Sequence, residues 1–292
     1  MLLAVIAYSL SLGLIWANQP KLLYKPTHVL QNTPADHNLD FQEHWIPVQR
    51  CVKHPDVLHS WWLRQPKNIE PQNHLGTLLY FHGAGLNIGY NVAQAHWMQK
   101  LGFNVLVVEY RGYGLSDQVN SHPGEDGDFP TERTFYEDAE AALRYLKTTW
   151  DIPDKEIFVY GHSLGGAIGI NLAVHHPDLA GLIVQNTFTT MADVVARSAY
   201  AGWFPVSAIL NQHFPSLQRV RDLKMPLLFI HATGDRKIPV EMGEQLYAAA
   251  PEPKTLLLVN SDVHHNAAAV YKSAAHLSQI RQFAEASLRV LD

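Results

Sequence analysis

The feature of this sequence that most restricts its fold is a series of short apolar runs that alternate with longer segments of helical spacing. Six such runs lie at 77–82, 104–110, 157–161, 181–186, 226–231 and 255–260. One intervening segment, 131–150, places four apolar residues on a single helical face: Phe135, Ala139, Leu143 and Leu146. Continuous apolar strands separated by helices are typical of a parallel sheet that is covered on both faces. We therefore expect one α/β domain with a mostly parallel central sheet.

A different pattern precedes the first of these runs. The segments 44–51 and 57–65 alternate in part between polar and apolar residues. The turn-forming residues His54, Pro55 and Asp56 lie between them. This pattern predicts an N-terminal β-hairpin at one end of the sheet.

Composition narrows the classes of function. Of the 292 residues, 47% are hydrophobic, and the formal net charge is −5 without long runs of one sign. No basic stripe is present, so we expect no nucleic-acid partner. The only cysteine, Cys51, excludes an intramolecular disulfide and a cysteine-based zinc site. The 17 histidines are scattered without helix-spaced pairs, and we predict neither a metal nor another cofactor.

The N-terminus has its own character, because residues 1–17 carry no charged side chain. As a helix they would span roughly 25 Å, slightly less than the ~30 Å hydrocarbon core of a bilayer. Trp16, Lys21 and Tyr24 then stand where interfacial anchors are useful. We expect an uncleaved membrane anchor at 1–17, a linker at 18–40 and the main domain at 41–292. A cleaved signal peptide and an apolar helix packed on the domain are the alternatives.

One serine occupies a position suited to catalysis. Ser163 lies in the pattern Gly161-x-Ser163-x-Gly165, between the apolar run 157–161 and a helix predicted over 164–175. Glycines at a strand-to-helix turn permit a crowded backbone that presents the hydroxyl to a substrate. The alternative is a tight packing turn whose serine only caps the helix. We interpret Ser163 as a candidate nucleophile.

A serine nucleophile requires a base and a carboxylate that orients the base. With this order of strands, the acid and then the histidine are expected in loops after later strands. Asp235 follows the run 226–231, and His264 and His265 follow the last run, before a helix that Asn266 can cap. The positions of these residues in the sequence do not by themselves show which of the two histidines is the base.

Acyl transfer also requires backbone donors for the oxyanion. The amide of Leu164 directly follows the candidate nucleophile. A second donor is expected in the loop after 77–82, where small residues let the backbone approach a substrate, and we place it at Ala84.

Six ordered blocks strengthen this interpretation: YFHGAGLNIG, VEYRGYGLSD, YEDAEAALRYL, VYGHSLGG, PLLFIHATGD and HHN. In these blocks, residues 20–290 resemble α/β-hydrolases of the α/β-hydrolase-domain, bud-emergence (Bem) type. The resemblance implies an α/β-hydrolase fold with a short cap, a membrane anchor and no cofactor. It implies Ser163 as nucleophile, Asp235 as acid and His265, directly followed by asparagine, as base. It matches Ala84 and Leu164 to the oxyanion positions.

The sequence departs from that family at two places. Ala84, Gly85 and Leu86 stand where Asn-Ala-Gly is usual, so backbone donation is retained but an asparagine side chain is not. Extra residues at 118–129 include the acidic Glu125, Asp126 and Asp128, which form a solvated surface loop in one interpretation and an acidic flap near the site in the other. The cap is expected at about 187–222, with Trp203 and Phe204 at its middle. In one interpretation the cap lines an acyl pocket, and in the other its apolar side chains only pack against the hydrophobic core.

These observations predict a serine hydrolase that cleaves ester or thioester bonds of lipid or acylated substrates through an acyl-enzyme. The alternatives are the same triad acting on peptide amides or small soluble esters, and a catalytically silent membrane-tethered scaffold. We expect a membrane-anchored location. Lys21 and Lys25 favour a cytoplasmic domain, whereas the resemblance favours the lumen or exterior; secretion or periplasmic release after cleavage is the further alternative.

Overall fold

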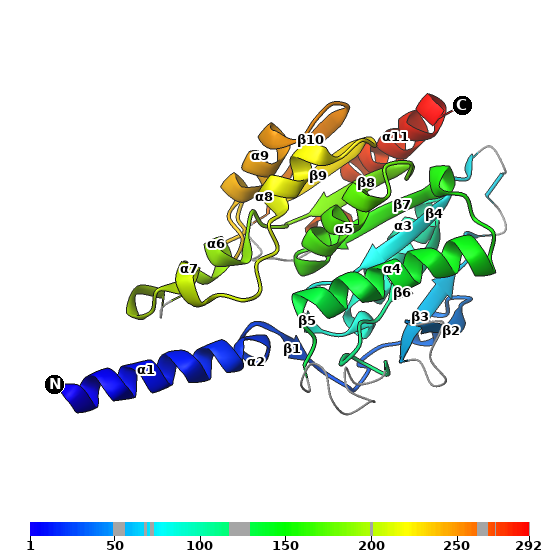
Figure 1. The fold of residues 1–292 in the computed structure, drawn as a ribbon. Helices are drawn as coiled ribbons and strands as arrows, with labels where there is room; N and C mark the ends of the chain where they lie inside the picture. The colour runs from blue at the N-terminus through cyan, green and yellow to red at the C-terminus, as the bar shows by residue number, and fades with distance from the viewer. Residues whose placement is uncertain are drawn as a thin grey trace.

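A computed structural model describes residues 1–48, 56–66, 69–70, 73–116, 129–198, 201–261, 268–271 and 273–291 of the chain (Figure 1). At the centre is an eight-stranded sheet in the order β10-β9-β8-β7-β4-β6-β3-β2. Its strands are β2 (Gln42–Pro47), β3 (Val57–Leu63), β4 (Thr77–Phe81), β6 (Asn104–Val108), β7 (Ile157–His162), β8 (Gly181–Gln185), β9 (Leu227–Ala232) and β10 (Lys254–Val259).

Six of these strands form a parallel array. β4 pairs in parallel with β6 and β7, and parallel pairing continues through β8 and β9 to β10. β2 and β3 pair antiparallel at the other end, as the predicted hairpin requires. The six apolar runs and the hairpin are confirmed within one or two residues at most strand ends. Because the strands are parallel, their following loops meet at one edge of the sheet.

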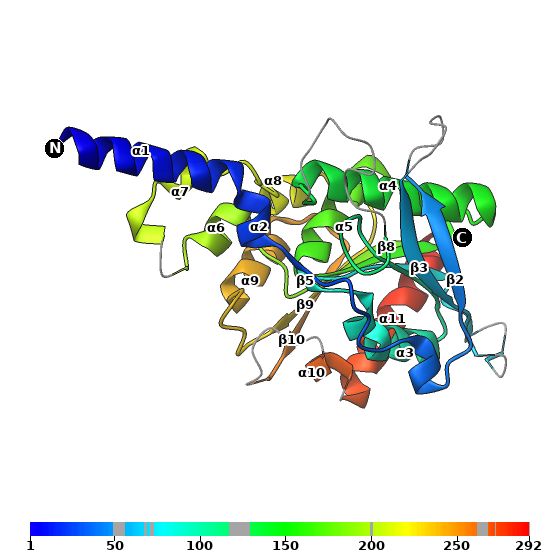
Figure 2. The ribbon, with the colours of Figure 1, turned by 90° about the horizontal axis from the view of Figure 1, so that it is seen from below.

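Helices cover both faces of the sheet (Figure 2). On one face lie α4 (Glu132–Thr149), α5 (Leu164–His175) and α9 (Val240–Ala249). On the other lie α3 (Val92–Leu101), α10 (Ala268–Tyr271) and α11 (Ala274–Leu291). Neighbouring residues of β4 divide between the two cores, since Leu79 packs with α4 and α5 whereas Leu78 and Tyr80 pack with α3 and α11. A strand buried on both sides has no polar face, which explains the continuous apolar runs.

The helix α4 shows how the sequence fixes one of these elements. The Thr131 hydroxyl accepts the amide of Thr134 at 3.3 Å, and the Thr134 hydroxyl accepts the amide of Thr131 at 2.7 Å, so a reciprocal cap begins the helix. The four apolar residues of the expected face are all buried. Burial of a Phe or Leu side chain contributes roughly 1.5–3 kcal/mol to folding, which anchors α4 on the sheet.

The N-terminal segment lies beside the strand-end loops rather than in the sheet. It contains α1 (Leu2–Ala17), α2 (Gln19–Leu23), β1 (Lys25–Pro26) and the 3-10 turn η1 (Pro34–His37). The segment predicted as a linker, 18–40, therefore holds short ordered elements. β1 pairs in parallel with β5 (Gly85–Leu86) in the loop after β4.

The helix α1 extends away from the body of the domain (Figure 1) and buries none of its residues. Its 16 residues correspond to about 24 Å at ~1.5 Å per residue. Among the described residues, no helix is both long enough and apolar enough to cross a membrane. The structure thus gives no support to the expectation of a transmembrane anchor.

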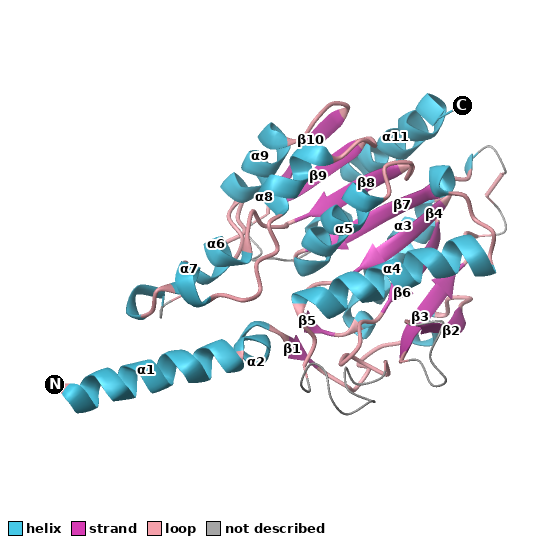
Figure 3. Ribbon diagram, viewed as in Figure 1, coloured by secondary structure: helices cyan, strands magenta, loops and turns pink. Residues whose placement is uncertain are grey.

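The cap region consists of short helices connected by loops (Figure 3). Between β8 and β9 the chain forms α6 (Met191–Val195), η5 (Ala201–Trp203), α7 (Val206–Ile209), α8 (Ser216–Arg219) and η6 (Val220–Asp222). In the two perpendicular ribbon views, α7 lies next to α1. Two further 3-10 turns in the described ranges are η3 (Ile88–Asn91) and η4 (Asp154–Glu156).

Candidate active site

Ser163 lies at the turn between β7 and α5, with φ 56° and ψ −117°. Non-glycine residues rarely adopt a positive φ, and such strain persists only where the surroundings enforce it. Here the Ser163 amide donates to Gln185 O at 2.9 Å, and the Thr187 hydroxyl donates to Ser163 O at 2.8 Å. Hydrogen bonds to strand β8 and to Thr187, just beyond its end, therefore fix the backbone of Ser163.

The glycines around Ser163 are required by space. A Cβ on Gly161 would lie under 3.0 Å from backbone atoms of Gly165 and Gly166, and a Cβ on Gly165 would meet the carbonyl groups of Phe81 and His82. Helix α5 can approach β7 and the end of β4 closely only because these side chains are absent. The pattern in the sequence thus has a steric cause.

Asp235 lies in the turn that follows β9, and it is 4% exposed. Its Oδ1 accepts the amides of Lys237 and Ile238, each at 2.9 Å. These bonds hold the carboxylate on the sheet edge that also carries Ser163, because β7, β8 and β9 are consecutive parallel strands. His264 and His265 lie outside the described residues, so the position of the expected base stays a prediction.

The loop after β4 carries Ala84, and two buried phenols hold it. Tyr113 donates its hydroxyl to Ala84 O at 2.8 Å, and Tyr110 donates to His82 O at 2.9 Å. Burial raises the pKa of both phenols well above the ordinary value, and the nearby Glu109 carboxylate adds to this for Tyr113. Both hydroxyls therefore keep their protons and remain donors. The hydrogen bond from Tyr113 to the Ala84 carbonyl thus fixes the backbone of Ala84.

A buried contact between His82 and Glu109 lies beneath the same loop. His82 Nε2 and Glu109 Oε1 are 2.8 Å apart, and both side chains are fully buried. The second Glu109 oxygen accepts the Ile88 amide at 3.0 Å, and His82 Nδ1 lies 2.8 Å from Gly83 O. His82 thus supports the loop from within.

Leu164 contributes the other expected donor. As the first residue of α5, its amide has no partner within the helix, and it points toward the helix N-terminus, where partial positive charge accumulates. Leu164, Ala84 and Ser163 all line one cavity.

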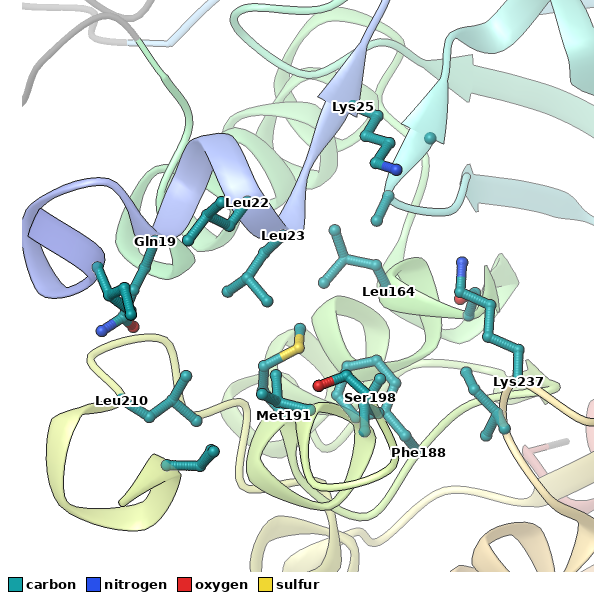
Figure 4. Close-up of a pocket in the computed structure, with 18 of the residues that line it drawn as sticks. Gln19, Leu22, Leu23, Lys25, Leu164, Phe188, Met191, Ser198, Leu210 and Lys237 are labelled. Atoms are coloured by element: carbon teal, nitrogen blue, oxygen red, sulfur yellow. The ribbon is translucent and has the colours of Figure 1, made fainter. Parts of the chain in front are cut away.

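This cavity has a volume of about 660 Å³ and is mainly apolar (Figure 4). It extends from Ser163 between the N-terminal segment and the cap. The cap side is formed by Phe188, Met191, Val194, Val195, Phe204 and Leu210, and the N-terminal side by Ile15, Gln19, Leu22, Leu23 and Lys25. Trp203 is 75% exposed and is not among the lining residues, although its neighbour Phe204 is.

Polar contacts connect the two walls. The Gln19 side chain donates to Ile209 O at 2.6 Å and accepts from the Asn211 amide at 2.8 Å. Tyr24 donates its hydroxyl to Gln212 Oε1 at 3.0 Å. The N-terminal segment is therefore a structural part of the cavity.

Sequence reasoning did not identify this contribution of residues 19–25. Leu22, Leu23 and Tyr24 in a polar stretch are the one local signal. Across the described ranges, no group of three or more His, Cys, Asp or Glu side chains is arranged to hold a metal ion.

A parallel sheet covered on both faces, with a strained serine at a strand-to-helix turn and a carboxylate after a later strand, is the arrangement of an α/β-hydrolase. The chain belongs to the family described as "Serine aminopeptidase, S33", whose model matches residues 72–219. It is thus a hydrolase by family, and the predicted fold class and Bem-type resemblance are confirmed.

Two relatives and one solved structure support this assignment. The chain is 29% identical to the α/β-hydrolase domain-containing protein WAV2 of Arabidopsis thaliana, over 82% of this chain and 77% of that protein. It is 28% identical to protein bem46 of Schizosaccharomyces pombe, over 79% of this chain and 74% of that protein. The fold matches the esterase Pf2001 of Pyrococcus furiosus with a TM-score of 0.66 and 19% identity, covering 89% of this chain and 97% of that one.

Proposed function

We propose that the protein is a serine hydrolase that cleaves carboxylic ester or thioester bonds of acylated, lipid-like substrates. The observation that carries the proposal is that Ser163 lines a mainly apolar cavity of about 660 Å³ together with Ala84 and Leu164, the first residue of α5. An acyl chain matches such a lumen, because each buried methylene contributes about 0.8 kcal/mol. The esterase activity in the name of the Pyrococcus furiosus neighbour is consistent with this reaction class.

In the proposed mechanism, Ser163 Oγ attacks the acyl carbonyl while His265 takes the hydroxyl proton and Asp235 orients the imidazole. The amides of Ala84 and Leu164 stabilise the negative oxygen of the tetrahedral intermediate. The leaving alcohol or thiol takes the proton from His265. Water then attacks the acyl-enzyme by the same route, which releases the carboxylic acid and restores Ser163.

The family name favours a second candidate, hydrolysis of a peptide amide at an amino terminus. An aminopeptidase needs an acidic or acceptor group that binds the α-ammonium of its substrate. Among the described residues that line the cavity there is no Asp or Glu, and the charged ones are Lys25 and Lys237. This lining favours the acyl ester or thioester. A silent scaffold would leave the strained backbone at Ser163 without purpose.

Graded acyl esters and thioesters, together with aminoacyl amides, test the choice. We expect turnover of the acyl substrates, a loss of about 10⁶ in kcat for Ser163→Ala and about 10⁴ for Asp235→Asn. His265→Ala should lose turnover, whereas His264→Ala is the matched control and should retain it. Turnover of aminoacyl amides alone would favour the peptidase.

We also propose that α1 associates with a membrane surface and places the protein there. Several of its side chains are exposed, among them Leu3 at 82% and Leu10 at 64%, and Ile15 near its end lines the cavity. An apolar helix beside the mouth of the cavity would bring lipid-derived substrates near Ser163. Sedimentation with lipid vesicles tests this, and we expect the full chain with Leu3→Ser and Leu10→Ser to lose binding. Unchanged binding would contradict a role for α1.

A further inference from the structure

Two lysines are the charged side chains among the described residues that line the cavity. Lys25 and Lys237 lie on the two sides of Leu164, whereas Gln19 and Leu210 lie at the opposite end (Figure 4). Apart from Gln19 and Ser198, the lining away from these lysines is apolar, and the positive charge gathers beside Leu164, the residue that follows Ser163. This distribution of charge indicates that the leaving group is anionic.

Lys25 is brought to the site by the pairing of β1 with β5. Its amide donates to Ala84 O at 3.1 Å, its Cα is the register partner of Gly85, and the Thr27 amide donates to Leu86 O at 3.3 Å. The residue is thus attached to the loop that carries the proposed oxyanion donor. The preceding Tyr24 is buried on the other side of the segment, which directs Lys25 toward the cavity.

Lys237 reaches the site from the opposite direction. Its amide donates to Asp235 Oδ1, so its backbone position is set by the carboxylate of the proposed triad. The next residue, Ile238, is 1% exposed and also lines the cavity. Lys237 therefore extends from a fixed turn.

Neither ammonium group is neutralised by the described part of the chain. No ion pair forms between Lys25 or Lys237 and any described carboxylate, and the described lining has no acid. Both side chains are exposed in the structure, so water solvates them while the site is free. Two positive charges that line the same cavity as Ser163, without a counter-ion among the described carboxylates, attract an anion, and lysine binds phosphate as a point charge.

We propose that the substrate is an acyl ester or thioester whose leaving group bears a phosphate, recognised by Lys25 and Lys237. The inference rests on the proposed function, because it assigns the acyl chain to the apolar lumen and the leaving group to the Leu164 side. An anionic phosphate carried by the leaving group is matched by two lysines. The phosphate comes either from a phospholipid headgroup or from a nucleotide-type thiol such as coenzyme A.

Matched pairs of substrates test the proposal and separate the two sources. 1-Palmitoylglycerol 3-phosphate is compared with 1-palmitoylglycerol, and palmitoyl-coenzyme A with the palmitoyl thioester of N-acetylcysteamine. The readout is the ratio of kcat/KM for the anionic to the neutral member of each pair. We expect a ratio above one for the wild type in at least one pair, and the pair that shows it identifies the source of the phosphate.

Lysine variants then assign the effect to residues. Exposed ion pairs contribute ~0.2–1 kcal/mol, so Lys25→Gln and Lys237→Gln should each lower the ratio by up to about 5-fold, and the double variant by up to about 25-fold. Lys224→Gln removes the same charge from an exposed position away from the cavity and should leave the ratio unchanged. Salt should lower the ratio more in the wild type than in the double variant. An unchanged ratio in the double variant would overturn the inference and leave the hydrolase proposal intact.

Binding without turnover keeps the two proposals apart. Calorimetry with Ser163→Ala, which cannot turn over substrate, should show tighter binding of dodecyl phosphate than of dodecanol, both below micelle-forming concentrations. Adding Lys25→Gln and Lys237→Gln should remove the difference. If the wild type hydrolyses no ester but this difference is found, the hydrolase proposal fails and anion recognition stands; equal binding of both ligands would refute anion recognition whatever the activity.

Discussion

Gly161→Ala is the substitution that most sharply tests how the fold holds Ser163. The added Cβ would lie under 3.0 Å from Gly165 O, Gly165 C and Gly166 N, all of them backbone atoms in the first turn of α5. These atoms cannot rotate away, so the turn must move, and overpacking of this kind costs about 1–3 kcal/mol. For a domain of this size that corresponds to a fall in Tm of roughly 2–10 °C. A displacement of Ser163 by about 1 Å reduces its reactivity by ~10²-fold.

Two measurements follow these effects in Gly161→Ala: the Tm from a thermal unfolding scan and the rate of covalent labelling by a fluorophosphonate probe. Gly202→Ala is the matched control, because a Cβ there meets nothing within 4 Å. It should keep both the Tm and the labelling rate. Wild-type values for both quantities in Gly161→Ala would refute the reasoning that backbone crowding around the glycines sets the position of the serine.

Three further predictions address the loop, the cavity and the core. Tyr113→Phe removes one of two donors to Ala84 O, so kcat should fall about 2- to 10-fold with KM little changed; a change in KM alone would argue against a positioning role. Met191→Trp narrows the cavity and should shift acyl preference to shorter chains in a chain-length series, by about 4-fold in kcat/KM for each excluded methylene; an identical profile would count against the cavity as acyl site. Burial lowers the pKa of His59 below its ordinary 6.5, although Glu43 opposes this, so its contribution to stability is present above that pH and is lost as the pH falls toward the folded-state pKa. The Tm of the wild type should therefore drop more between pH 7.5 and 5.5 than that of His59→Gln, and equal drops would exclude the effect.

The sheet and the main helices were predictable because their patterns follow from burial alone. β4, β7 and β9 are covered on both faces, so almost every residue in them must be apolar, and that requirement is visible in the sequence without knowledge of the neighbours. The helix over 164–175 was located by the glycine pattern before it and is found with the predicted ends. The reason is local: the same turn that crowds Ser163 also starts the helix.

The N-terminal wall of the cavity was not predictable for the opposite reason. α2 has five residues, fewer than an isolated helix needs, and β1 has two. Both exist because distant partners hold them, Gln19 through the cap and Lys25 through Ala84. No periodicity in residues 18–40 records such contacts. The position of Lys25 beside the candidate nucleophile therefore emerged only from the folded chain.

The cap shows an intermediate case. Its apolar composition suggested a pocket lining, and Phe204 does line the cavity, but Trp203, the largest side chain at its middle, faces solvent. Composition indicates that a segment meets an apolar space; it does not indicate which neighbour turns inward. That choice depends on the course of the backbone around η5, which composition does not specify.

The central claim is that Ser163 is an activated nucleophile, and the most direct measurement is covalent labelling of the intact protein with a fluorophosphonate probe, followed by peptide mapping with mass spectrometry. The account predicts a single adduct on the peptide that contains Ser163, absent from Ser163→Ala. An unlabelled wild-type protein, or an adduct that persists in Ser163→Ala, would contradict it.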